Sequence, residues 1–209
     1  PGITYVNITL NTSFSSISVE NVSVDNNAHT IVLSPGTTKL VTCNATIRDE
    51  VGYENIANAT AVFYDSSVTS SYAFDDNNNH YTNDSCYLWP GSGKTRIATC
   101  TFDVWYYANN NSNNDWVCNV TATNNASVEA SNIDTINIDP LIAFDVPSTI
   151  NYGTVDVYSL SLENITSVTN LGNVMIDIKL EGYGYVDGDG LAMNCSGGTI
   201  GNITFIPRH

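Results

Sequence analysis

The sequence predicts an all-β protein in which antiparallel strands pack into sandwiches. Helical periodicity is almost absent from the 209 residues, and short runs of alternating apolar and polar side chains recur instead. Turn-forming clusters such as SPGT, DDNNN, PGSG and DGDG separate these runs. Many short strands divided by frequent turns are typical of sandwich folds.

The opening segment, PGITYVNITLNTSF, is a clear alternating run with two different faces. Its apolar residues share the even positions: Val6, Ile8, Leu10 and Phe14. On the odd side, Asn7 and Asn11 each begin an Asn-x-Ser/Thr sequon. No turn joins this run to a partner strand close behind it. We therefore expect residues 1–19 to form an extended strand that pairs with something distant in the sequence.

The rest of the chain divides into two blocks with similar openings. Residues 20–139 contain four of the five cysteines and the long Asn-rich loops, and Pro140 begins a second set of alternating runs. Each block opens with a Val/Asp strand, a short strand, a Gly turn and a longer strand that ends in a sequon. This organisation predicts two tandem immunoglobulin-like sandwiches, 20–139 and 140–209. The second has only 70 residues, against roughly 100 for a complete fold of this type, so we expect it to lack a strand.

The charge balance excludes several classes of partner. The chain has 21 acidic and 6 basic residues and a formal net charge of −15, so it repels nucleic acid and anionic lipid. No apolar run approaches the roughly 18 residues that span a bilayer, so we expect no membrane insertion in this segment. Because neither an initiator Met nor a signal peptide is present, we expect a processed chain or a fragment.

Asparagine indicates where the protein is located. Of 28 asparagines, 12 begin sequons, about twice the number expected by chance. In LVTCNATI, WVCNVTAT and IANATAVF, alternation places the sequon on the face opposite the apolar residues, the side where a bulky glycan is tolerated. The sequence therefore predicts a heavily N-glycosylated, extracellular or cell-surface protein. The 12 predicted sites are Asn7, Asn11, Asn21, Asn44, Asn58, Asn83, Asn110, Asn119, Asn125, Asn164, Asn194 and Asn202.

The cysteines favour disulfides over a metal site. No CxxC pair occurs and the chain has only three histidines, so a zinc site is not expected. Cys86 and Cys100 flank a Pro-Gly turn, which suits a disulfide across a hairpin, and Cys43 and Cys118 lie on inward strand faces. Four cysteines allow three pairings, of which we rank 43–118 with 86–100 first. Cys195 is then left over, and a partner in another chain or in sequence beyond this segment would explain it.

The sequence offers no recognisable catalytic or cofactor site. None of the histidines lies in a nucleophile–base motif, and GSGKT at residues 91–95 lacks the full phosphate-loop pattern. Asp75, Asp76, Asp187 and Asp189 offer oxygen ligands of the calcium type, but such runs are also common turn formers. We therefore expect no enzyme and no cofactor beyond covalent N-glycans, with the aspartate runs serving as turns.

Several stretches resemble a family of secreted archaeal surface proteins found in small-genome lineages. They are VTCNATIRDEVGYENIANATAVFYD, CTFDVWYYA, WVCNVTATN, STINYGTVDVYSLSLENITSVTNLGNVMIDIKLEGYG and GDGLAMNCS, which lie between about Asn21 and Gly198. The resemblance implies export, β-sandwich domains and an envelope location, and no enzyme. Members of that family continue with further strands beyond the segment that matches NITFIPRH, a point at which this sequence departs from them.

Two functions follow from these expectations. In the first, the protein is a structural subunit of an extracellular filament, and copies of itself are its partners. Residues 3–14 of one subunit would complete the second sandwich of the next by donor-strand complementation, as in archaeal thread-like filaments by analogy. In the alternative, it is a monomeric surface adhesin or receptor, whose Tyr-rich stretches WYYA and EGYGYV bind a glycan or a protein.

Overall fold

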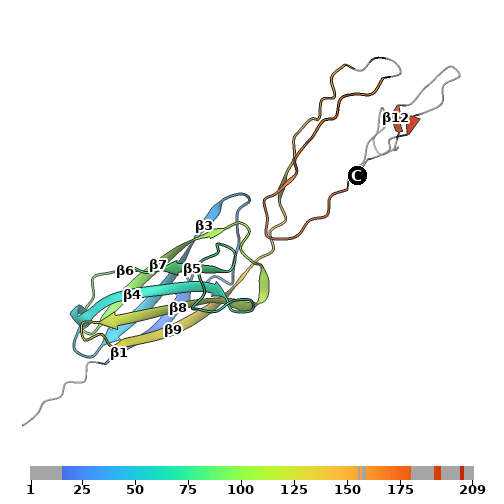
Figure 1. Cartoon of the computed structure of the whole chain (residues 1–209). Helices are drawn as coiled ribbons and strands as arrows, with labels where there is room; N and C mark the ends of the chain where they lie inside the picture. Colours follow the sequence, from blue (N-terminus) through green and yellow to red (C-terminus); the bar gives the residue numbers. More distant parts are fainter. Residues whose placement is uncertain (1–15, 155, 157–158, 180–190, 194–202, 205–209) are drawn as a thin grey trace, which may run out of the picture. The chain divides into compact units, whose positions relative to one another are not determined.

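The computed structural model describes residues 16–154, 156, 159–179, 191–193 and 203–204. Two β-sheets make up most of it (Figure 1). The four-stranded sheet has the order β1 (Ile17–Val24), β3 (Thr38–Asp49), β7 (Thr95–Trp105) and β6 (Tyr87–Leu88). The five-stranded sheet has the order β2 (Thr30–Ile31), β9 (Glu129–Ile138), β8 (Asn111–Asn124), β4 (Ile56–Asp65) and β5 (His80–Asn83). One short 3-10 helix, η1 (Tyr53–Asn55), lies between β3 and β4.

The two sheets form an immunoglobulin-like sandwich, as the sequence predicts for this block. In a constant-type domain, strands A, B, E and D form one sheet and C, F and G the other. Here β1, β3, β7 and β6 take the places of the first set, and β4, β8 and β9 those of the second. All these neighbours pair antiparallel, whereas β2 pairs parallel with the end of β9. We call β1–β9 the first sandwich.

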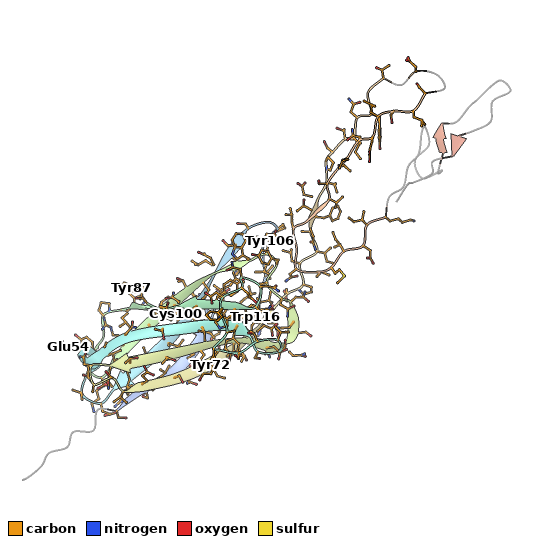
Figure 2. The ribbon with its side chains drawn as sticks, in the orientation of Figure 1. Glu54, Tyr72, Tyr87, Cys100, Tyr106 and Trp116 are labelled. Carbon is orange, nitrogen blue, oxygen red and sulfur yellow. A yellow bond between two sulfur atoms is a disulfide. The ribbon has the colours of Figure 1, made fainter. Side chains whose placement is uncertain are left out.

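Side chains at alternate positions of the strands fill the core between the sheets. In β3, every second side chain from Val41 to Ile47 is buried, as predicted from LVTCNATI. Trp116 of β8 is fully buried, and its ring lies 4.8 Å from that of Phe63 in β4. Figure 2 shows Trp116 within the sandwich and Tyr87 near its surface. Fully burying one such aromatic side chain stabilises the fold by about 3 kcal/mol.

Alternation in IANATAVF predicts that Ala57, Ala59, Ala61 and Phe63 share the face of β4 opposite Asn58, and this prediction is only partly correct. Ala59, Ala61 and Phe63 point inward as expected, but Ala57 is exposed and Ile56 is buried instead. The pairing with β8 shifts register between Ile56 and Asn58. Such a bulge inserts one extra residue and reverses the faces on one side of it.

Both predicted disulfides are present. Cys43 of β3 and Cys118 of β8 join the two sheets through the core, with Cα atoms 6.6 Å apart. These are the strand positions of the inter-sheet disulfide of immunoglobulin domains. Cys86 and Cys100 join β6 to β7 across their hairpin, with Cα atoms 4.4 Å apart. Cys86 also donates its N–H to Ala59 O of β4 at 2.9 Å, where the chain passes from one sheet to the other.

The described part of residues 140–209 has much less regular structure. It contains β10 (Phe144–Asp145) paired with β11 (Thr169–Asn170), and β12 (Leu191–Met193) paired with β13 (Ile203–Thr204). The chain divides into compact units Pro1–Val174 and Met175–His209, so this boundary differs from the predicted one at residue 140. No second pair of packed sheets is present among the described residues, and the second sandwich stays a prediction.

The predicted N-terminal strand is also untested. Val6, Ile8, Leu10 and Phe14 lie outside the described residues. β1 begins at Ile17, within the segment that the sequence assigns to the N-terminal strand, so the first sandwich starts earlier than predicted.

Candidate functional surfaces

We call the described residues between 141 and 174 the ribbon, because they form a two-stranded hairpin around β10 and β11 (Figure 1). Leu171 N–H donates to Ala143 O at 2.9 Å, and Ser159 N–H donates to Asp156 O at 3.1 Å in the turn. Apolar side chains along this hairpin are exposed to solvent. They are Ile142, Phe144, Val146, Ile150, Tyr152, Leu160, Leu162 and Ile165. We call these side chains the apolar strip; exposed apolar side chains gathered along one segment are typical of interaction surfaces.

A clamp of three residues, Leu171, Gly172 and Asn173, holds the base of the ribbon against the first sandwich. The Asn173 side chain accepts from Leu141 N at 2.7 Å and donates to Ala108 O and Asp139 O at 3.0 and 3.1 Å. A Cβ on Gly172 would lie 2.0 Å from Leu141 O, so no side chain fits there. The clamp explains why the first compact unit extends to Val174.

Eight of the twelve sequon asparagines lie within the described residues, and none of the eight is buried. Asn21, Asn58, Asn125 and Asn164 are exposed, and Asn44, Asn83, Asn110 and Asn119 are half-buried. These positions are compatible with attached glycans. The structure does not describe Asn7, Asn11, Asn194 and Asn202.

The sites differ in whether the side-chain amide of the asparagine is already engaged in native contacts. Asn110 Nδ2 donates to Asn173 O at 2.7 Å and so takes part in docking the clamp. Asn119 has a buried Oδ1 without a partner among the described residues. Asn21 and Asn58 are exposed on β1 and β4. A glycan therefore competes with native contacts at Asn110 but not at the two exposed sites.

The aspartate loop before β5 is organised by its own carboxylates. Asp76 Oδ1 accepts the backbone N–H groups of Asn78, Asn79 and His80 at 2.9, 2.6 and 3.0 Å. Burial acts to raise the pKa of Asp76, but these hydrogen bonds outweigh it and hold the pKa below its ordinary value. Asp75 accepts from Thr82 and pairs with buried His80 at 2.8 Å. The two carboxylates therefore organise the loop through hydrogen bonds to its own backbone and side chains.

A groove of about 550 Å³ lies between this loop and β7. Its walls include Asp75, Asn77 and Thr82 on one side, and Thr101, Asp103 and Trp105 on the other. Trp105 begins the WYYA stretch, and its ring stacks on Tyr107 at a centroid distance of 5.7 Å. The sequence could not reveal this groove, because its two walls are about 25 positions apart in the chain.

The edge of β7 beside the groove is capped by side chains. Trp89 N–H donates to Ile97 O, so the backbone of Ile97 faces β6. Because backbone groups alternate along a strand, those of Thr101, Asp103 and Trp105 face the same edge beyond the end of β6. Asn83 Nδ2 donates to Thr101 O at 3.0 Å, and Trp105 N–H donates to the Tyr81 hydroxyl at 3.1 Å. Among these three, Trp105 has partners for both backbone groups and Thr101 for its carbonyl, whereas the Asp103 groups and the Thr101 N–H have none among the described residues.

The other residues singled out in the sequence have structural roles or fall outside the description. GSGKT is the β6–β7 turn, in which Ser92 and Thr95 exchange backbone hydrogen bonds and Lys94 pairs with Glu50 at 2.5 Å. Asp187, Asp189 and Cys195 lie outside the described residues.

Neither models of known protein families nor curated protein sequences match this chain. Within the described ranges, no cluster of three or more metal-ligating side chains occurs. No helix in that same part of the chain is long and apolar enough to cross a bilayer.

Proposed function

We propose that the protein is a structural subunit of an extracellular, N-glycosylated filament. Residues 3–14 of one copy add as a strand to the ribbon of the next copy, so that subunits join head to tail. The observation that carries this proposal is the exposed apolar strip of the ribbon. The disulfides are compatible with an extracellular location.

The ribbon needs a partner. A two-stranded hairpin alone is marginally stable in water, and a third strand or a packing surface is needed to stabilise it. Phe144 is 59% exposed, and Leu160 and Leu162 are 93% and 88% exposed. Residues two apart in an extended strand share a face, so Leu160 and Leu162 present one continuous apolar surface.

The N-terminal segment has the complementary pattern. Val6, Ile8, Leu10 and Phe14 occupy even positions, and the sequons at Asn7 and Asn11 occupy odd ones. A strand of this kind can bury its apolar face on a partner while its glycans remain in solvent. Burying four side chains at about 2 kcal/mol each contributes roughly 8 kcal/mol before the cost of ordering the segment.

The first sandwich is a poor acceptor for an added strand. Its β7 edge is capped by Tyr81 and Asn83. Its β1 edge is bridged to β9, since Val24 N–H donates to Asp134 Oδ2 at 2.9 Å and Asn132 Nδ2 donates to Val19 O at 3.1 Å. The edge strands β2 and β5 have only two and four residues. Short and capped edges resist strand addition.

The N-terminal segment and the ribbon are attached at opposite ends of the first sandwich, which favours contact between different copies. Ile17, at the start of β1, pairs with Asp49, and Asp49 accepts from Asn124 at the β8–β9 turn. β9 then runs ten residues away from that end before the ribbon begins. At about 3.4 Å per residue, the two attachment points are roughly 30 Å apart. A head-to-tail contact between opposite ends of neighbouring copies generates a filament when its rotation does not close a ring.

The test compares charges placed on the two faces of the N-terminal segment. Deleting residues 1–14, or substituting Ile8→Asp with Leu10→Asp, should leave soluble monomers. The matched control, Asn7→Asp with Asn11→Asp, adds the same charge to the opposite face and should still give threads. High-speed sedimentation and negative-stain microscopy distinguish the two outcomes. Normal filaments from the deletion variant would contradict the proposed joint.

A further inference from the structure

The groove between the aspartate loop and β7 has the chemistry of a binding site for a neutral ligand. Its volume of about 550 Å³ lies within the roughly 300–1,000 Å³ typical of small-molecule sites. One wall is formed by Trp105, whose side chain is 36% exposed. The remaining lining is dominated by hydroxyl, amide and carboxylate groups, and it includes no Lys, Arg or His.

Some polar groups of the groove already accept hydrogen bonds within the protein, whereas others are exposed to a ligand. Asp75 already accepts hydrogen bonds from the hydroxyl and N–H of Thr82. Asp103 is exposed on β7, and its backbone faces the open edge. A ligand with hydroxyl donors can satisfy this carboxylate and backbone carbonyl. An anionic ligand is disfavoured, because the lining is acidic and the whole chain carries a net charge of −15.

Internal hydrogen bonds hold the groove in shape before a ligand arrives. The Tyr81 hydroxyl donates to Asn77 O at 2.6 Å and accepts Trp105 N–H at 3.1 Å, which ties the loop to β7. Asp76 fixes the loop through three backbone N–H groups. A preformed site loses less free energy to ordering when it binds.

The same bonds argue against an extended peptide as the ligand. An added strand needs a row of open backbone groups, but the Thr101 carbonyl and the Trp105 N–H already have side-chain partners. Along this edge only Asp103 has both its N–H and its C=O without a partner among the described residues, so an incoming strand would find no continuous row. A ligand bound chiefly through hydroxyl groups does not need that row.

We propose that this groove binds a neutral carbohydrate. One sugar ring packs its C–H face against the Trp105 indole, and its hydroxyls donate to the Asp103 carboxylate and exchange hydrogen bonds with the Thr101 hydroxyl and the Asn77 amide. An aromatic ring provides an apolar surface for the sugar ring, and fixed polar groups set its orientation. This site is independent of the filament joint, since it uses no residue of the ribbon or of the N-terminal segment.

The test uses the full chain and neutral di- and trisaccharides of glucose, galactose, mannose and N-acetylglucosamine. Titration calorimetry, together with tryptophan fluorescence, should show saturable binding of at least one of them. Trp105→Ala should weaken that binding at least tenfold, and Asp103→Asn should weaken it several-fold. Trp89→Ala is the matched control, because Trp89 is 49% exposed but lies outside the groove lining; it should bind like the unaltered protein.

Folding and alternative ligands are checked in the same experiment. Thermal unfolding of each variant separates loss of the site from loss of the fold. If Trp105→Ala does not fold, the test rests on Asp103→Asn, because Asp103 is exposed and its substitution should leave the fold intact. Absence of saturable binding across the whole sugar set would overturn the proposal, as would equal losses in Trp105→Ala and Trp89→Ala. A synthetic peptide of residues 3–14 that binds the full chain but not Trp105→Ala would make the groove a peptide site and also overturn it.

Discussion

The first sandwich and the ribbon have the same alternating pattern of apolar residues, but only the sandwich buries it. Val41, Cys43 and Ile47 of β3 are fully buried, whereas Ile142 and Phe144 of the ribbon are 70% and 59% exposed. Alternation defines an apolar face in both regions. Burial requires a second sheet to pack against, and the described residues provide one only for the sandwich. The comparison suggests that the ribbon's partner comes from elsewhere.

The largest difference between the two regions should appear in the free energy of unfolding when one apolar side chain is removed from each. Phe63→Ala creates a cavity in the core and should lower the free energy of unfolding by about 3–5 kcal/mol. Leu160→Ala removes an exposed side chain and should change it by less than about 0.5 kcal/mol. Urea unfolding under conditions that keep the protein monomeric measures both. A large loss in Leu160→Ala would show that the ribbon is buried within a single copy.

A smaller, local effect should follow from a substitution at the junction of the two regions. The Cβ of Gly172→Ala would collide with Leu141 O, so it should destabilise the clamp by about 1–3 kcal/mol. Hydrogen exchange at the Leu141 and Asn173 amides should accelerate, because these groups bond within the clamp.

Gly153→Ala is the control for this substitution, since Gly153 has open space around it. Its positive φ of 73° means that alanine is strained there as well, but the strain lies away from the clamp. Equal acceleration of exchange in both variants would show that Gly172 has no special role in docking the ribbon.

The smallest effect is a dependence of sandwich stability on acid pH. Burial acts to raise the pKa of Asp49, but hydrogen bonds from Asn124, Val51 and Asn55 lower it below the ordinary value of 3.8. The unfolded chain therefore binds the proton first, and the stabilisation is complete above that value and lost as pH falls through the folded pKa.

Asp49→Asn should flatten the acid limb of a plot of unfolding free energy against pH below the ordinary carboxyl pKa of 3.8. Glu50, whose pKa is lowered to about 2 by Lys94 and Arg48, also loses its charge as the pH falls. Its exposed ion pairs should weaken with added salt, so the measurement at high salt isolates the contribution of Asp49. An unchanged acid limb in Asp49→Asn at high salt would exclude this carboxylate as its source.

Sequence patterns predict the sandwich and its disulfides because these depend on local alternation and turn positions. Cys43 and Cys118 fall on apolar faces that can be read from their own strands. The Ala57 error came from a bulge, which depends on pairing with β8 and leaves no clear mark in β4 alone.

The clamp and the groove could not be predicted from the sequence. NLGN at residues 170–173 has the composition of an ordinary turn, yet Asn173 bonds to Ala108, 65 positions earlier. The groove requires the loop before β5 to lie beside Trp105, and only the tertiary fold brings them together. Both features join residues that are distant in the sequence through hydrogen bonds that no periodicity encodes.

In the proposed filament, the capped edge of β7 would limit how many copies one molecule can engage. A subunit with several open edges would take several neighbours, and its assemblies would branch into networks or precipitate. Tyr81 and Asn83 occupy the backbone groups that a stray strand would need. If subunits join by the proposed strand addition, this capping would leave each copy one acceptor site, and the assemblies would grow as unbranched threads.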